Sequence, residues 1–155
     1  AGWAWAARYA LVTLGLTHPE VVQDAAQSVA EVVLGYDGPS PRRLIPTGDV
    51  DRAATALAKK LGGQASVMIE GLGNREFDTV SEKFVAQTFG AANALLKPDS
   101  FLSKDRRGQI RATLEAAKAT GRKAYFEFRS GVHDEVLDFI KRNADRVGVG
   151  YEVSR

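Results

Sequence analysis

Two oxygen-bearing side chains, Asp78 and Gln87, stand nine positions apart in a segment of short β-branched and aromatic runs. If these runs pair as a hairpin, an acid on one strand lies opposite an amide carbonyl on its neighbour. Such a pair can ligate a hard cation such as Mg²⁺, which takes one or two carboxylates together with water and a substrate phosphate. Glu70 ends the preceding run and is a candidate third ligand, while Glu76 shares a strand face with Asp78.

A basic segment follows the candidate hairpin. The whole chain has a formal net charge of only +2, but residues 97–129 hold nine basic and four acidic residues, a local excess of +5. This distribution is typical of a surface that binds a polyanion. The basic side chains nearest the predicted helix over 105–120 are candidate phosphate contacts: Lys97, Lys104, Arg106, Arg107 and Arg111.

The elements that must position these residues follow from apolar spacing and from glycine and proline. A helix that starts near Asp49 and ends at Gly62-Gly63 precedes three strands, a loop over 91–104 and a second helix. The predicted ranges after the first helix are strands 65–70, 76–81 and 83–89, helix 105–120, strand 123–128, helix 132–147 and strand 149–153. A helix over 80–89 is the alternative to the hairpin.

The first part of the chain has a different pattern. Residues 3–34 predict two short helices that divide at Thr17 to Pro19, and the proline-containing stretch 35–48 predicts a linker. We therefore expect an N-terminal helical segment and linker over 1–47 and a catalytic domain over 48–155. The longest apolar stretch, residues 3–16, is shorter than the roughly 20 residues of a membrane-spanning helix, so we expect no stable membrane insertion.

Composition restricts the chemistry further. The chain has 155 residues, 45% of them apolar, which predicts a buried core and excludes a disordered tail. It has no cysteine and two histidines, so any metal site must use carboxylates. Because the chain starts with Ala and has no basic stretch before an apolar run, we expect a fragment of a larger protein.

The element order and several motifs resemble a known nuclease fold. Arg75-Glu76-Phe77-Asp78 followed by Phe84-Val85-Ala86-Gln87 resembles the PD-(D/E)XK, or restriction-endonuclease-like, nucleases. The stretches 109–117, 120–122 and 125–128 are similar to restriction-endonuclease-fold toxin domains, which stand at the C-terminus of large polymorphic bacterial toxins, including contact-dependent growth inhibition effectors. The resemblance covers residues 49–155 and implies an α/β core of helix, three strands, helix, strand, helix and strand, with residues 1–47 as a helical appendage.

The resemblance implies roles for individual residues. The metal-binding Asp of the family falls on Asp78, and the acid or Gln of its next strand falls on Gln87. The motif lysine would fall on Phe89, which has no charge. Some members of the fold supply that cation from a neighbouring helix, which makes Lys104 a candidate catalytic cation, with Lys97, Arg106 and Arg107 as alternatives. The acid expected on the first helix has Asp51 as its nearest match.

The resemblance also implies a function. We expect a toxin that hydrolyses RNA, tRNA above all, with a divalent metal of the Mg²⁺ type, which binds carboxylate oxygens. A cognate immunity protein would neutralise it, and a larger secreted or cell-surface effector would deliver it to the target-cell cytoplasm. Two alternatives stay open: a metal-dependent DNase of the same fold, and a non-catalytic nucleic-acid-binding module.

Overall fold

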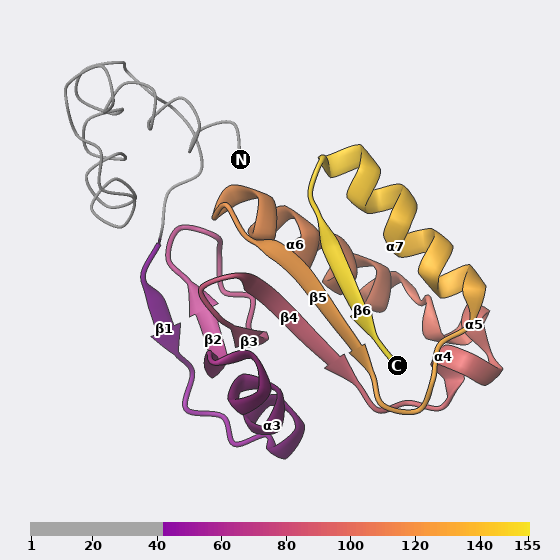
Figure 1. Ribbon diagram of the computed structural model, residues 1–155, viewed down its shortest axis with the longest axis horizontal. Coiled ribbons are helices and arrows are strands. Elements are labelled where there is room, and N and C mark those ends of the chain that lie inside the picture. The colour runs from indigo at the N-terminus through magenta and orange to yellow at the C-terminus, as the bar shows by residue number, and fades with distance from the viewer. Residues whose placement is uncertain (1–41) are drawn as a thin grey trace. The chain divides into compact units, whose positions relative to one another are not determined.

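The computed structural model describes residues 42–155, which form a six-stranded mixed sheet with helices on both faces (Figure 1). The two helices expected within residues 3–34, and the start of the expected linker, lie outside the described residues. No helix within residues 42–155 has the length and apolar character needed to cross a bilayer.

The elements confirm the predicted order of helix, three strands, helix, strand, helix and strand. Their boundaries are β1 Leu44–Pro46, α3 Arg52–Leu61, β2 Gln64–Ile69, β3 Phe77–Val80, β4 Phe84–Phe89, α4 Asn93–Leu96, α5 Pro98–Phe101, α6 Lys104–Ala119, β5 Lys123–Phe128, α7 Asp134–Val147 and β6 Tyr151–Ser154. The fold is therefore the mixed α/β architecture expected from the sequence.

The strands lie in sequence order across the sheet, from β1 to β6. The first four are antiparallel to their neighbours, whereas β4 pairs in parallel with β5, and β5 with β6. Val80 pairs with Val85 across the β3–β4 turn, which confirms the hairpin and makes the helical alternative for residues 80–89 wrong. The parallel strands require crossover helices, and α6 and α7 fill that role.

Local signals in the sequence fix where the helices begin and end. The Asp51 carboxylate accepts a hydrogen bond from the backbone N–H of Ala54 at 3.0 Å and so caps α3. Gly62, with φ of 70°, ends that helix in the left-handed conformation that glycine adopts without steric cost. The Ser103 hydroxyl caps α6 by accepting from the backbone N–H of Arg106.

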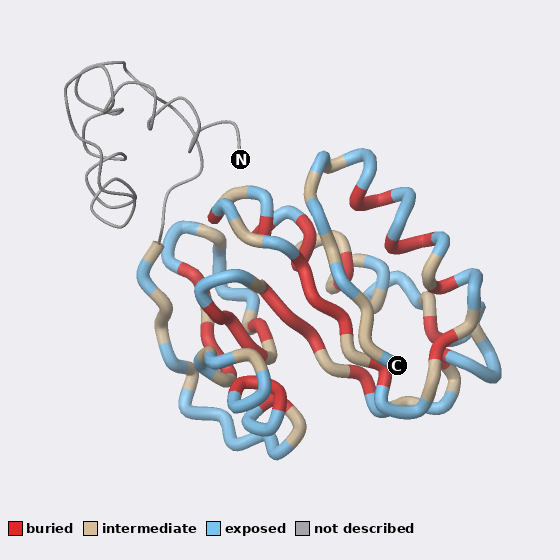
Figure 2. Tube along the Cα trace, viewed as in Figure 1, coloured by how far each residue is buried: buried red, intermediate tan, exposed pale blue. Residues whose placement is uncertain are grey.

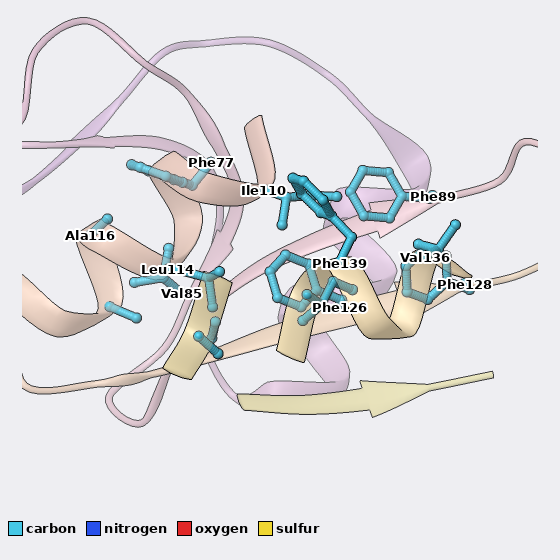
Figure 3. Close-up of a cluster of buried hydrophobic side chains, with 14 of the residues drawn as sticks. Phe77, Val85, Phe89, Ile110, Leu114, Ala116, Phe126, Phe128, Val136 and Phe139 are labelled. Carbon is cyan, nitrogen blue, oxygen red and sulfur yellow. The ribbon is translucent and has the colours of Figure 1, made fainter. Parts of the chain in front are cut away.

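The two faces of the sheet bury cores of unequal size. The main core lies between the sheet and helices α6 and α7, and Figure 3 shows its aromatic and aliphatic side chains, with Phe126 and Phe128 of β5 among them. A smaller cluster of Leu57, Ala86 and Tyr125 lies under α3 on the opposite face. The buried positions follow the central strands and the inner sides of the helices (Figure 2).

Two connections differ from the sequence expectation. The linker expected over 35–48 contributes β1, which pairs with β2 at the sheet edge. An edge strand tolerates a proline such as Pro46, because proline has no backbone N–H to donate and an edge strand has a neighbour on one side alone. The loop expected over 91–104 contains the short helices α4 and α5. Four-residue helices have too few positions to show an apolar period, which is why the sequence pattern does not predict them.

Candidate nuclease site

The β3 strand changes face at Asp78. Phe77 lies in the main core, whereas the hydroxyl of Thr79 donates to the carbonyl of Ala54 in α3 on the other face. Residues two positions apart share a face in a regular strand, so β3 is irregular at the residue between them. Ser66, which stands opposite Asp78 between two paired positions of β2, has a positive φ of 53°. The sheet is thus distorted on both strands at this point.

The distortion gives the Asp78 carboxylate a backbone partner. Pairing between β3 and β4 is regular at Thr79–Ala86, and beyond it the Asp78 Oδ2 accepts a hydrogen bond from the Thr88 backbone N–H at 2.9 Å. Burial raises the pKa of Asp78 above its ordinary value, the Thr88 bond lowers it, and the like charge of Asp51 raises it. The charges of Arg106 and Arg129 lower the pKa of Asp78.

A hydrogen-bond chain joins the ends of β4 and β5 beside Asp78. The Thr88 hydroxyl donates to Glu127 Oε1 at 2.6 Å and accepts from Arg129 Nε at 3.0 Å. The other oxygen of Glu127 lies 3.7 Å from Lys60 Nζ. A Cβ atom at Gly90 would lie 2.6 Å from Arg129 Nη2, so glycine at that position leaves the room that this guanidinium occupies. Arg129 is thus held at the edge of the site.

Arg106 approaches from the first turn of α6. Its guanidinium carbon lies 4.9 Å from the ring centres of both Phe89 and Phe101. Its Nη1 donates to Gln109 Oε1 at 3.0 Å. Burial lowers the pKa of Arg106, and the charge of Asp78 acts in the opposite direction, so the guanidinium and the carboxylate influence each other.

A second acidic pair lies next to Asp78. The Thr47 hydroxyl donates to Glu76 Oε2, which lowers the pKa of that carboxyl, but burial and the neighbouring Asp49 raise it to a net value above the ordinary one. The charge of Asp78 adds to the upward shift. Glu76 and Asp78 therefore repel each other, as expected for two acids near one end of β3.

The three predicted metal ligands lie in different surroundings. Gln87 has 0% of its surface exposed and lies under α6, where its Nε2 donates to the Thr113 hydroxyl at 3.2 Å and its Oε1 accepts from Gln109 Nε2 at 3.3 Å. Glu70 is exposed and accepts from Arg43 Nε at 3.0 Å. The structure thus does not bring Gln87 and Glu70 together with Asp78.

The predicted cations also divide into groups. Lys97, Lys104 and Arg107 are exposed at the surface near the start of α6. Arg111 instead turns toward α7, where its Nε donates to Asn143 Oδ1 at 3.2 Å and its guanidinium lies 5.3 Å from the Phe139 ring centre. Arg106 is the member of this set whose charge acts on Asp78.

Sequence reasoning missed the contributions of Thr88, Glu127 and Arg129. A signal for Glu127 was present, because it is an acid among the apolar residues of a strand and stands two positions from Tyr125 on the α3 face. Arg129 follows the end of that strand directly, at the edge where parallel strands bring their carboxyl ends together. Thr88 carries no charge and gave no signal of its own.

Comparison with known families identifies the family of the chain. The family described as Restriction endonuclease fold toxin 3 matches residues 44–150. The chain belongs to this family. The matched range contains every element from β1 to α7, and with them Asp51, Asp78, Arg106 and Arg129. No curated protein and no solved structure matches the chain.

Family membership makes the chain a toxin domain with a nuclease fold. The restriction endonuclease fold generally uses divalent metals, and nucleic acid is the substrate class of such a domain. Among the described residues, the half-buried Asp78 carboxylate at the irregular position of β3, on whose pKa the charges of Arg106 and Arg129 act, is a candidate site for phosphodiester chemistry.

Proposed function

We propose that this toxin domain is a metal-dependent endonuclease that hydrolyses phosphodiester bonds of RNA, and of tRNA in particular. The observation that carries the proposal is that the half-buried Asp78 carboxylate is held by the backbone of Thr88, whose hydroxyl holds Arg129, and that the charges of Asp51, Arg106 and Arg129 act on its pKa. Phosphoryl chemistry needs such a combination, because carboxylates hold a divalent metal while cations stabilise the charge that develops on the phosphate.

The donor set fits a divalent cation of the Mg²⁺ type. One oxygen of Asp78 accepts from Thr88 and one oxygen of Asp51 accepts from Ala54, which leaves each carboxylate a second oxygen for a ligand bond. Within residues 42–155 no three acidic or histidine side chains converge on one point. Two carboxylates suffice for Mg²⁺, which completes its shell with water and substrate phosphate. When bound, such a cation supplies Lewis-acid polarisation of the phosphate.

The other residues of the site bind and orient the substrate. Arg129 is held by Thr88, whose hydroxyl is held in turn by Glu127, so its remaining N–H groups can donate to phosphate oxygens. Arg106 lies on two aromatic rings and presents its guanidinium at the start of α6. The exposed cations Lys97, Lys104 and Arg107 extend this surface toward neighbouring phosphates.

We choose tRNA because the chain resembles toxin domains that commonly disable translation. The side chains of the site carry no feature that selects ribose over deoxyribose. A DNase of the same fold, and a module that binds nucleic acid without cutting it, are therefore outcomes of the test described next. The proposal includes delivery as the C-terminus of a larger secreted or cell-surface effector, action in the target-cell cytoplasm and neutralisation by a cognate immunity protein.

The test is incubation of the purified chain with total bacterial RNA and with plasmid DNA, each with Mg²⁺ or with EDTA, beside an Asp78→Ala variant. A discrete tRNA fragment that requires both Mg²⁺ and Asp78 supports the proposal. Cleavage of DNA without cleavage of RNA would identify a DNase of the same fold. Salt-sensitive binding of either polymer without cleavage identifies a binding module.

A further inference from the structure

We propose that Arg106 contacts the scissile phosphate and that Gln87 positions it through Gln109. This inference rests on the proposed nuclease function and assigns residues to the same site. It gives the fully buried Gln87 a role other than metal ligation, and it selects one cation among those near the start of α6.

The first observation is that Arg106 is a partly buried cation without an acidic partner in contact. Within the described residues, the one hydrogen bond of its guanidinium is to the neutral amide of Gln109, and no carboxylate lies within 4.0 Å of that guanidinium. Burial therefore disfavours its charge without a compensating ion pair. An arginine has five N–H donors, so most of those on Arg106 remain for an anionic ligand.

The second observation is its place on α6. Arg106 lies in the first turn, where the partial positive charge of the helix N-terminus disfavours a cation. The position therefore costs stability, whereas a phosphate would be attracted by both the helix end and the guanidinium. Asp78 accepts from the backbone N–H of Thr88, and the Arg106 guanidinium lies 4.9 Å from the ring centre of the next residue, Phe89, so the cation and the carboxylate approach the same end of β4.

The third observation explains the aromatic residue at the position of the motif lysine. The Arg106 guanidinium packs against the buried rings of both Phe89 and Phe101. The two rings contact each other edge to face, with centres 5.3 Å apart. Stacking on two rings fixes the plane of the guanidinium. The strand position thus holds an aromatic support for a cation that comes from the helix.

The fourth observation is a relay of amides that ends at Arg106. Thr113 holds Gln87, Gln87 Oε1 accepts from Gln109 Nε2, and Gln109 Oε1 accepts from Arg106 Nη1. Both ends of each amide are used, so the order of donors and acceptors along the chain is fixed. Gln87 is buried completely and cannot reorient toward solvent. It therefore holds Gln109 in the rotamer that orients the guanidinium.

The experiment compares the cleavage kinetics of Arg106→Ala, Gln87→Met and the double variant in the full chain, with Arg142→Ala on the exposed side of α7 as the charge-matched control. We expect Arg106→Ala to lower kcat about 10²- to 10³-fold, as loss of one transition-state donor does, with a much smaller change in KM. Gln87→Met should lower kcat by about 10- to 100-fold through misplacement of the guanidinium. Added guanidinium ion should partly restore kcat of Arg106→Ala.

The double variant gives the readout that separates positioning from a general structural role. If Gln87 acts through Arg106, adding Gln87→Met to Arg106→Ala causes no further loss of kcat. The inference would be overturned if the kcat of the double variant were reduced by the product of the two single-variant factors. It would also be overturned if Arg106→Ala were as active as Arg142→Ala. Arg106→Lys covers the case of a poorly folded alanine variant, since it keeps the charge without the planar fork and should still lose kcat. An inactive wild-type chain would instead refute the proposed function.

Discussion

Replacing Gln87 by Glu separates a metal-ligand role for this residue from a positioning role. The substitution changes one amide nitrogen to oxygen at a side chain with 0% exposure. If Gln87 binds metal, a carboxylate should bind it more tightly. If Gln87 holds Gln109 and Thr113, the new carboxylate is a buried charge whose two neighbours are both neutral.

The expected cost follows from that environment. Arg106 bonds to Gln109 rather than to residue 87, so no cation pairs directly with the new charge. A buried charge left without its partner destabilises a protein by about 3–5 kcal/mol, which at roughly 4 °C per kcal/mol lowers Tm by about 12–20 °C in a domain of this size. Burial raises the pKa of such a carboxyl, so the lost stability returns as the pH falls and the group is protonated.

The assay is thermal and urea unfolding of wild type and Gln87→Glu at pH 8 and pH 5, with a Mg²⁺ titration of cleavage activity at pH 8. We expect a lower Tm at pH 8, a smaller difference at pH 5 and no fall in the Mg²⁺ concentration at half-maximal activity. A variant as stable as wild type at pH 8 that needs less Mg²⁺ would exclude the positioning role and favour a metal-ligand role for Gln87.

Substitutions at three positions test other parts of the site. Asp51→Ser keeps a capping hydroxyl for the N–H of Ala54 and removes the carboxylate, so we expect activity to fall with little change in Tm, whereas Asp51→Ala should also cost about 1 kcal/mol in urea unfolding. Equal activity of Asp51→Ser and wild type would exclude this carboxylate from the site. Asp78→Asn should be inactive, and it should be more stable than wild type at pH 8. The reason is that burial raises the pKa of Asp78 in the folded protein, so folding favours the protonated carboxyl. That contribution to stability is present below the ordinary pKa of 3.8 and is lost as the pH rises through the folded-state pKa, whereas Asn does not titrate. Unfolding curves from pH 3 to pH 8 check this prediction. An increase in the unfolding free energy of wild type relative to Asp78→Asn as the pH rises would contradict it. Gly90→Ala should displace the guanidinium of Arg129 and raise KM without lowering Tm, and an unchanged KM would remove Arg129 from substrate binding.

Most of the fold could be predicted because its elements carry strong local signals. The apolar stripe of α3 ends at Gly62, and the short Ser81-Glu82-Lys83 connection permits the β3–β4 hairpin. Where the pattern is short, it fails: β1 has three residues, and α4 and α5 have four each. Such elements are fixed by contacts with distant residues, such as the pairing of Leu44 with Ile69, which no local window contains.

The site was harder to predict because one irregular position decides which side chains meet. The placement of Gln87 opposite Asp78 assumed a regular ladder, but β3 changes face at Asp78, and Gln87 lies under α6. A shift of one residue moves a side chain to the other face of a sheet. Asp78 has the hydrogen-bond partner that an acid inside a strand requires, the backbone N–H of Thr88, and its role as a metal ligand stays a prediction.

The proposed function depends above all on Asp78 as the catalytic carboxylate of a nuclease. The most direct measurement is the single-turnover rate at which wild type, Asp78→Ala and the exposed-acid control Glu82→Ala cleave total bacterial RNA in Mg²⁺. We expect Glu82→Ala to cleave at the wild-type rate and Asp78→Ala to yield no fragment above the level found in EDTA. Cleavage by Asp78→Ala at the rate of Glu82→Ala would contradict it.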